Sequence, residues 1–543
     1  MNLKTVVLPA LVVLAVVSVV TWAARSPDPQ AVPLSFAAPS DDVADSVAKV
    51  DRLFENVWED KELVPAGRAS ELQILRRMSL ALHGTVPSLE ELRQFESDTR
   101  PDRLRHWTVR LLADNRFADY FAERLSRCFV GTDEGQFVLF RRDRFNDWLI
   151  EQLREKRPYD ATVRSMIAEQ GLWTDSPASN FATAAVVEGD VDENKLAGRV
   201  VRAFLGQRMD CAQCHDHPFD DWTQQQYEGI AAQFAHVRAS LVGMEDKQIS
   251  DGESVEYVIE DRETLEDRVV PPSVPFHPEW LPDAGTRREQ LAAWVTHPEN
   301  RRFERATANR VWGLLFGKPY YEPVDDLPDP PKDEEPGLLD VLGADFREHG
   351  YDLHHLIRVI VASRPFQVDS AHPTVADEAE LDRLSEQWAL FPMTRLRPEQ
   401  VIGAILQSGS IRTIDRNSHL IVRFIRFIRE NDFVEEYGDL GEDELLQRPG
   451  TIPQALLQMN GELPNELLEA NPFNASGRIA TFAGTDEKCL DTCYLVCLTR
   501  RPSPAERDYF VAQLEETSGD QRTAVIEDML WSIFNTREFS CNH

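Results

Sequence analysis

Beyond its first 25 residues, the chain has no apolar run long enough to span a membrane. It also has no glycine-rich phosphate loop, serine-nucleophile elbow or zinc-protease helix motif, so the common signals of three large enzyme classes are missing. Basic residues are scarce, because 58 Lys and Arg stand against 92 Asp and Glu, a formal charge of −34. Such a field repels phosphate, and we expect no nucleic-acid partner.

The N-terminus has the pattern of a targeting segment. Lys4 precedes an apolar run over residues 6–24, which Arg25 and a polar, proline-containing stretch end. The run spans about 19 residues, just enough to cross a bilayer as a helix. Thr21 and Ala23 are a mediocre match to a cleavage site, so we interpret residues 1–25 as a signal peptide or, preferably, an N-terminal membrane anchor. The remainder is then expected outside the cytoplasm, in the periplasm or cell envelope.

Hydrophobic periodicity predicts a mainly α protein with two helical domains and a small β insertion between them. Residues 26–41 are rich in proline and small residues and are expected to form a linker. The first helical domain is predicted over residues 42–238 and the second over residues 286–543. Between them, over residues 239–285, Val255, Tyr257 and Ile259 alternate with polar residues, which is a strand pattern.

The most specific motif is Cys211-Ala-Gln-Cys214-His215, which matches the attachment pattern of c-type haem. Two thiols separated by two residues can form thioethers with the two vinyl groups of one porphyrin, and the following histidine becomes the proximal iron ligand. Composition alone would produce this pattern about 0.002 times in such a chain. The predicted cofactor is therefore one covalent haem c, and attachment outside the cytoplasm agrees with the N-terminal signal.

Three other interpretations of the motif stay open. Together with His217, the motif offers four zinc ligands, although structural zinc sites usually draw two pairs from separate segments. Cys211 and Cys214 are also spaced as a redox dithiol or disulfide. The third interpretation is a cluster without a cofactor.

The sixth haem ligand is not fixed by the sequence. Met209, His217, His236 and Met244 are the local candidates, and we favour His236 or Met244, with an open position as the alternative. Two strong axial ligands favour electron transfer, whereas an open position permits chemistry on a small molecule.

The chain resembles a planctomycete family of exported proteins, in which a domain of unknown function with a cytochrome-c-type motif precedes a second helical domain of unknown function. The resemblance is carried by residues 75–84, 211–222, 309–317 and 452–461 and extends over roughly residues 65–540. It implies an extracytoplasmic location and a haem, but no established reaction. The acidic stretch at residues 332–335 departs from the family pattern.

Other groups have weaker signals. Asn309, Arg310, Glu322, Asp325 and Asp326 lie around one predicted helix, where paired carboxylates could act as acid and base, although ion pairing is the commoner role.

Cys489, Cys493 and Cys497 recur on one helix face, as small core residues do, and one of them could pair with Cys541 or Cys128. His349, His354 and His355 are expected to be exposed.

These observations favour a membrane-anchored, extracytoplasmic protein similar to c-type cytochromes, which exchanges electrons with an unknown redox partner protein. Two alternatives remain: a haem- or metal-dependent periplasmic enzyme, for instance one acting on polysaccharide, and a non-catalytic envelope scaffold. Whether the protein is an enzyme is left open.

Overall fold

The computed structural model describes residues 43–132, 141–172, 174–187, 190–240, 243–247, 256–260, 265–331, 335–415, 432–438, 441, 445–446, 449–472, 474–515 and 517–543. Over these residues the chain forms 23 α-helices and eight short strands, so it has the mainly α fold that its periodicity predicts. The predicted anchor and linker lie outside the described residues. Within them, no helix combines the length and the apolarity needed to cross a membrane.

The helices of the N-terminal half begin and end at the residues that the sequence favours. They are α2 (Ala44–Asp60), α3 (Glu71–His83), α4 (Leu89–Ser97), α5 (Arg103–Ala113), α6 (Asn115–Val130), α7 (Arg142–Arg154), α8 (Tyr159–Ala168), α9 (Asn180–Thr183), α10 (Glu193–Val200) and α11 (Gln224–Ala231). Ser70 and Ser88 start α3 and α4 with capping boxes. Gly84 ends α3 at φ +69°, where a Cβ would collide with the Tyr120 ring, so glycine is required there.

All the described strands occur in two-stranded antiparallel pairs. β1 (Val186–Val187) pairs with β2 (Asp190–Val191), β3 (Val237–Ser240) with β4 (Gly243–Asp246), β5 (Tyr257–Glu260) with β6 (Asp267–Val270), and β7 (Thr394–Arg395) with β8 (Cys541–Asn542). The second and third pairs form the β insertion, in which Tyr257 is buried and Val258 is half exposed, as the alternation predicts. The β7–β8 pair, by contrast, joins segments almost 150 residues apart and has no local signal.

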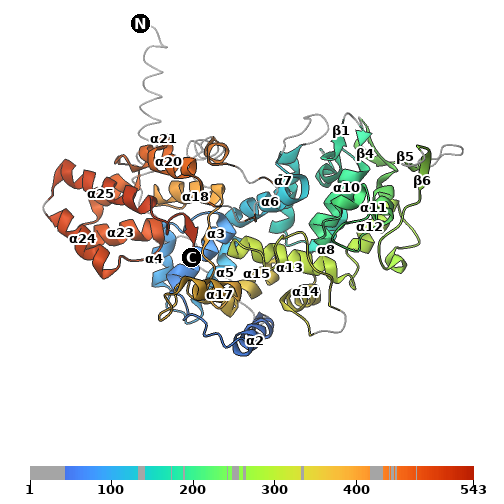
Figure 1. The fold of residues 1–543 in the computed structure, drawn as a ribbon. Helices are drawn as coiled ribbons and strands as arrows, with labels where there is room; N and C mark the ends of the chain where they lie inside the picture. Colours follow the sequence, from blue (N-terminus) through green and yellow to red (C-terminus); the bar gives the residue numbers. More distant parts are fainter. Residues whose placement is uncertain are drawn as a thin grey trace, which may run out of the picture.

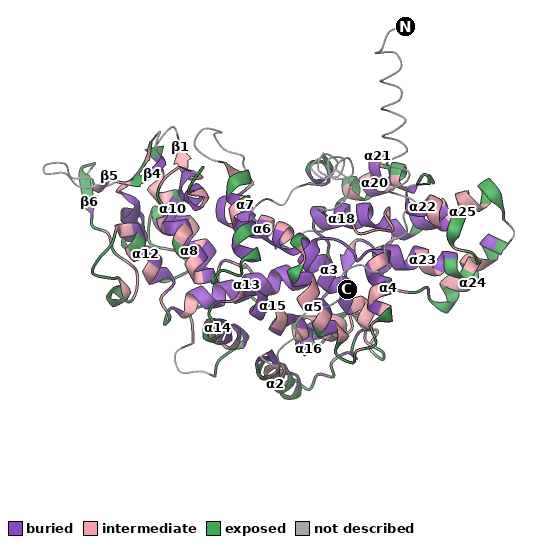
Figure 2. Cartoon of the chain, turned by 180° about the vertical axis from the view of Figure 1, so that it is seen from behind, coloured by how far each residue is buried: buried purple, intermediate pink, exposed green. Residues whose placement is uncertain are grey.

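The helices of the C-terminal half run from α12, which lies beside α8 near the β insertion, through the centre of the molecule to α22–α25 at the other end (Figure 1). They are α12 (Arg287–Val295), α13 (Arg301–Phe316), α14 (Leu338–Glu348), α15 (Leu353–Ala362), α16 (Arg364–Gln367), α17 (Glu378–Glu386), α18 (Pro398–Ser408), α20 (Ile452–Asn460), α21 (Glu462–Leu468), α22 (Ala475–Phe482), α23 (Asp486–Leu498), α24 (Pro504–Glu515) and α25 (Gly519–Phe534). Helix α13 is the central one, since all residues from Phe303 to Phe316 are buried (Figure 2).

The two halves of the chain are interleaved. In Figure 1 the N-terminal helix α3 lies in the middle of the molecule, between the β insertion at one end and α22–α25 at the other. Arg76 and Arg77 of α3 are fully buried and reach across to the C-terminal half. The Arg76 guanidinium donates to the carbonyl of Cys497 at 2.9 Å, and Arg77 donates to the carbonyls of Phe366 and Val368. These bonds connect α3 to segments about 290 and 420 residues away.

Candidate functional site

The turn that carries the cysteines is positioned from both domains. After α10 the chain continues as a π-helical segment, Val201–Leu205, and then turns at Gly206. Gly206 has φ +61°, and its carbonyl accepts from the Leu327 amide at 2.8 Å. The Gln207 amide side chain donates to the Leu327 carbonyl at 2.6 Å. The loop after α13 therefore fixes the start of the cysteine turn.

The two thiols come from one short 3-10 helix, Asp210–Gln213, which contains Cys211 and is followed directly by Cys214 as its C-cap. Cys211 and Cys214 are exposed free thiols, whereas Ala212 between them is fully buried. The Ala212 amide donates to the Met209 carbonyl at 2.8 Å. One buried alanine thus anchors the turn, and both sulfur atoms are available to a group that approaches from outside.

His215 has the tautomer that a proximal iron ligand needs. Its ring is exposed, and Nδ1 lies 2.7 Å from the backbone oxygen of Asp216. Because a carbonyl oxygen only accepts, Nδ1 of the neutral ring must carry the proton, and the lone pair is on Nε2. A hydrogen bond from one ring nitrogen to a carbonyl is the usual support for a histidine that binds a metal through the other.

His217 is placed differently. Its Nδ1 accepts from the amide of Phe219 at 3.3 Å, and its own amide donates to the Trp222 carbonyl at 2.7 Å. The side chain is 9% exposed. His217 therefore supports the loop that follows the motif. Within the described residues, no three ligand atoms from this stretch gather closely enough for an ion, so a preformed zinc site is not present there.

The loop after the motif presents an aromatic surface. Phe219 is 90% exposed, which is unusual for a phenylalanine, and Trp222 is half-buried with the Arg302 guanidinium 5.2 Å from its ring centre. Thr223 caps the following helix, α11, through a capping box with Gln226. The carboxylate of Asp216 accepts from the Gln224 amide at 2.9 Å and connects the motif to the start of this helix.

The candidate sixth ligands differ in burial. Met244 is fully buried in β4, opposite Ala239 of β3, and Met209 is 1% exposed. His236 is half-buried just before β3, and its carbonyl accepts from the Lys247 amide at 2.8 Å. The Nε2 atom of His236 is itself buried. Burial therefore does not choose between His236 and Met244.

A cavity of about 370 Å³ lies beside the cysteine turn, where the two domains meet. Its walls come from α10, the π-helical segment, the 3-10 helix, α13 and the loop after α13. The lining includes Arg202, Arg208, Asp210, Gln213, Arg310 and, from the loop after α13, Pro319 and residues 322–325. Asp210 and Gln213 belong to the same turn as Cys211, so the cavity and the motif are adjacent.

Asn309, Arg310, Glu322, Asp325 and Asp326 do come together here, largely in structural roles. Asn309 accepts from the Tyr321 amide at 2.9 Å and donates to the Tyr321 and Val324 carbonyls, which fixes the loop. Glu322 is exposed at the cavity mouth, and Arg310 lines the cavity wall. The loop is thus built by α13.

Asp325 is paired with two arginines of the first domain. Arg202 lies 2.8 Å and Arg208 2.7 Å from its carboxylate. Burial raises the pKa of Asp325 most strongly, but Arg202 and Arg208 together outweigh it, so the pKa lies below its ordinary value. A carboxylate stabilised in this way is a poor general acid near neutral pH. We therefore assign Asp325 a role in joining the domains.

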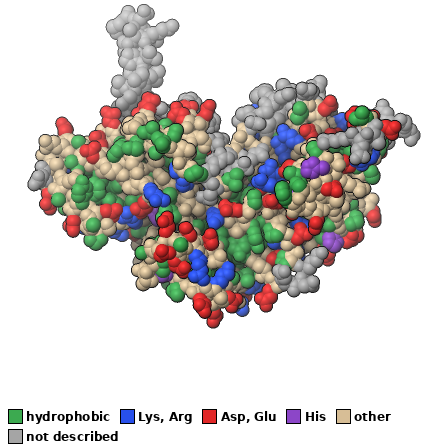
Figure 3. Space-filling model, in the orientation of Figure 1, with side chains coloured by type: hydrophobic (Ala, Val, Ile, Leu, Met, Phe, Trp, Pro, Cys, Tyr) green, Lys and Arg blue, Asp and Glu red, His purple; other side chains and the backbone are tan. Residues whose placement is uncertain are grey.

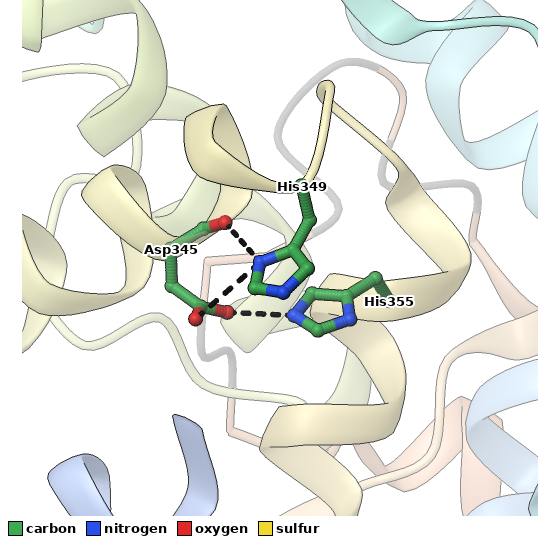
Figure 4. A group of neighbouring side chains, drawn as sticks. All are labelled: Asp345, His349 and His355. Carbon is green, nitrogen blue, oxygen red and sulfur yellow. Dashed lines mark hydrogen bonds and ion pairs between the residues drawn. The ribbon is translucent and has the colours of Figure 1, made fainter. Parts of the chain in front are cut away.

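The histidine-rich region was predicted to be exposed, and this is wrong for two of its members. His354 is 7% and His355 3% exposed, because α15 packs its first turn inward. Figure 4 shows that Asp345, His349 and His355 lie side by side, and no spacing rule had singled out Asp345.

His355 Nε2 is 2.8 Å from the Asp345 carboxylate, which also accepts from Ser46. His349 Nδ1 is 2.8 Å from the Asp345 carbonyl oxygen. The two imidazoles stack with ring centres 3.7 Å apart. One ligand atom from each of the three residues lies within 4.8 Å of the others, but His355 Nε2 and His349 Nδ1 both already face Asp345 oxygens. The arrangement is a hydrogen-bonded contact between α14, α15 and α2.

All seven cysteines are free thiols, and all lie within the described residues. Cys489, Cys493 and Cys497 are fully buried on α23, as predicted for core residues. Cys541 is buried in β8, and Cys128 is half-buried and lines the cavity. The two solvent-exposed thiols of the protein are therefore those of the motif.

Comparison with known proteins identifies two domains. Residues 49–239 match the model of PSCyt2, a protein of unknown function (DUF1549), and residues 287–418 match that of PSD1, a protein of unknown function (DUF1553). No curated protein and no solved structure matches. The cysteine turn belongs to the first domain, and the loop after α13 belongs to the second. The chain thus carries a DUF1549 domain followed in tandem by a DUF1553 domain.

Proposed function

We propose that the protein is an extracytoplasmic c-type cytochrome that carries one covalent haem at Cys211 and Cys214, with His215 as the proximal ligand. The observation that carries the proposal is the geometry of the turn. Two exposed thiols flank a buried alanine, and the next residue is a histidine with its Nε2 lone pair available. These are the groups that thioether attachment and axial ligation require.

The neighbouring residues fit a porphyrin at this surface. Phe219 has 90% of its side chain in solvent and would become covered if a flat apolar group attached to the turn. Haem c supplies a one-electron redox couple when bound. Cys211 and Cys214 would attach it, and the Asp216 carbonyl would hold the His215 ring. Because both cysteines are exposed, attachment there favours electron exchange with a partner protein over chemistry in a closed pocket.

The expected location rests on the N-terminal segment. An apolar run of about 19 residues after Lys4 supports export with retention as an anchor. Haem attachment to a Cys-x-x-Cys-His motif takes place outside the cytoplasm in bacteria, so the two expectations support each other. The resemblance to exported planctomycete proteins supports the same location. At a charge of −34, the protein favours a redox partner with a basic docking surface.

The test is covalent pigment on the unfolded chain. The full chain is produced in a host that matures c-type cytochromes, denatured, separated by electrophoresis and stained for haem. We expect a haem band, a mass increase equal to one haem, and loss of both in Cys214→Ala. Cys489→Ala, which changes a buried thiol, is the matched control and is expected to keep the stain. An unfolded wild-type chain of purely polypeptide mass would refute the proposal.

The adjacent cavity supports a second candidate, a haem-dependent enzyme. The ferrous protein distinguishes the two, because carbon monoxide binding requires an open axial position. A spectrum that carbon monoxide leaves unchanged favours electron transfer with His236 as sixth ligand. A shift of the main absorption band on adding carbon monoxide favours the enzyme. His236→Ala is expected to convert the first behaviour into the second.

A further inference from the structure

The cavity beside the cysteine turn is unusually cationic for this protein. Its lining has five basic side chains (Lys195, Arg199, Arg202, Arg208 and Arg310) and four acidic ones (Asp192, Asp210, Glu322 and Asp325). The local balance is one surplus positive charge, in a chain whose formal charge is −34. In Figure 3, Lys and Arg side chains gather beside the notch in the upper edge of the molecule. This lining therefore opposes an anion less than the acidic remainder of the protein does.

One of these arginines is buried without a partner. Arg310 is 8% exposed and lines the cavity, and among the described residues it makes no hydrogen bond or ion pair. Its positive charge helps to lower the pKa of Asp325, but that carboxylate is already held by Arg202 and Arg208. The N–H donors of this guanidinium are therefore available to an anion that enters the cavity.

The walls on the Arg310 side also offer apolar contacts. Pro319, Pro323 and Val324 line the cavity in the loop that follows α13. Asn309 holds this loop in place by three hydrogen bonds, so the surface is preformed. A volume of about 370 Å³ lies at the small end of the range typical for organic ligands. Charge and shape together describe a ligand with one negative group and an apolar body.

We infer that this cavity binds a small organic carboxylate, whose two oxygens pair with the Arg310 guanidinium. A guanidinium and a carboxylate match as two parallel N–H···O bonds, which favours a carboxylate over a point-like anion. One negative charge also cancels the surplus of the lining. Phosphate, with a higher charge and no apolar body, fits less well.

The carboxylate can come from two sources. One is a free organic acid that enters from solvent. The other, which rests on the proposed function, is a propionate of the haem itself, because Asp210 and Gln213 of the cysteine turn form part of the cavity wall. Both sources present the same chemistry to Arg310.

The test begins with protein that cannot carry haem, the full chain with Cys211→Ala and Cys214→Ala. Sodium benzoate is titrated by calorimetry, with benzamide as the uncharged control. We expect saturable benzoate binding, at least tenfold weaker binding of benzamide, and at least tenfold weaker benzoate binding after Arg310→Met. Arg310→Lys keeps the positive charge but cannot make two parallel hydrogen bonds to a carboxylate. Its affinity for benzoate is expected to lie between that of its parent and that of Arg310→Met. Arg105→Met, an exposed change on α5, is the matched control and is expected to bind as well as its parent.

Several results would overturn the inference: no saturable benzoate binding, equal binding of benzamide, unchanged binding in Arg310→Met with a native circular dichroism spectrum, or tighter binding of inorganic phosphate than of benzoate.

The same titration on haem-loaded wild type then separates the two sources of the carboxylate. Binding to both forms identifies a free acid, and binding only to the haem-free form identifies a propionate. If wild type never acquires haem, the proposed function fails, while the benzoate result still decides the inference.

Discussion

Two regions of the molecule treat buried arginine in opposite ways. In α3, Arg77 is fully buried, donates to three backbone carbonyls and lies 3.6 Å above the Phe391 ring. In the cavity wall, Arg310 is almost as deeply buried and has no hydrogen-bonded partner among the described residues. Burial lowers the pKa of Arg77 to about 9, so it still carries its charge at neutral pH. The fold gives the Arg77 guanidinium three hydrogen bonds, although one of its terminal nitrogens has none, whereas the Arg310 guanidinium has no hydrogen bond among the described residues.

The difference distinguishes an arginine that stabilises the fold through hydrogen bonds from one whose donors are available to a ligand. Arg124 and Arg127 of α6 belong with Arg77, because both reach the carboxylate of Glu399 on α18, at 2.9 and 3.1 Å. Arg288 does too, since Asp246 and two carbonyls surround it. Each of these side chains joins elements distant in sequence. Arg310 connects no such elements through a hydrogen bond or ion pair among the described residues. Of Arg77, Arg124, Arg127, Arg288 and Arg310, it is the one that lines the cavity.

The largest effect is expected at Glu399. Glu399→Gln removes the buried carboxylate that Arg124 and Arg127 share and leaves them only the partly exposed Glu123, which should lower the free energy of unfolding by about 3–5 kcal/mol at pH 7. Burial raises the pKa of Glu399 most, but the two arginines outweigh it and bring the pKa to about 2.

Because the folded pKa is below the ordinary 4.5, this stability is present above pH 4.5 and is lost as the pH falls towards 2. Denaturation of Glu399→Gln should thus show a weaker pH dependence in that window than wild type. Glu436→Gln, an exposed change, is the control, and an equal loss there would contradict the assignment.

Arg77→Met should come next. It removes three hydrogen bonds and the contact with Phe391, and it leaves the carbonyls of Phe366, Val368 and His543 without this donor. We expect a loss of about 2–4 kcal/mol in the free energy of unfolding, measured by chemical denaturation. Arg105→Met should change it by less than about 0.5 kcal/mol. Wild-type stability in Arg77→Met would remove the distinction between the two regions.

Asp325→Asn tests Arg202 and Arg208, which line the cavity and are also paired with a carboxylate. It removes the carboxylate that Arg202 and Arg208 share, and both arginines are about one-third exposed. Solvent screening therefore limits the expected loss of stability to about 1–2 kcal/mol. The same change adds a net positive charge to the cavity, so benzoate should bind several-fold tighter. Weaker benzoate binding in this variant would mean that Asp325, rather than Arg310, organises the site.

Arg310→Met should have the smallest effect on stability. Arg310 has no hydrogen-bonded partner among the described residues. The free energy of unfolding of the variant should therefore stay within about 0.5 kcal/mol of wild type, or rise because a buried charge has been removed. Thermal and chemical denaturation of the unliganded protein measure this. A loss comparable to that of Arg77→Met would show that Arg310 is a structural cation after all.

Local signals predicted much of the fold. The helical periodicity is found as a mainly α fold, in which Ser70, Ser88 and Gly84 stand at helix ends as their residue types favour, and the strand alternation around Tyr257 is found in β5. The pairing of β7 with β8 was not predictable, because two-residue strands have no periodicity. His355 was misplaced because its burial depends on Asp345 and Ser46, which lie on other helices.

The candidate site was predictable in part. The Cys-x-x-Cys-His spacing marked Cys211, Cys214 and His215, and the structure adds that the thiols face solvent and that Asp216 fixes the imidazole tautomer. Arg310 had been noted only as a neighbour of acidic residues. Its significance depends on the absence of a hydrogen-bonded partner among the described residues, and no sequence pattern indicates such an absence.

The bonds from α3 to the distant half of the chain also bear on how the protein is made. Arg76 reaches the Cys497 carbonyl, 421 residues later, so the buried donors of α3 stay unsatisfied until α23 has been synthesised and docked. An N-terminal half that emerges first cannot complete its interior alone, and it exposes an unfinished surface to chaperones in the meantime. Expression of the DUF1549 segment as a separate fragment should therefore give aggregated material, and co-expression with the remaining chain should rescue it.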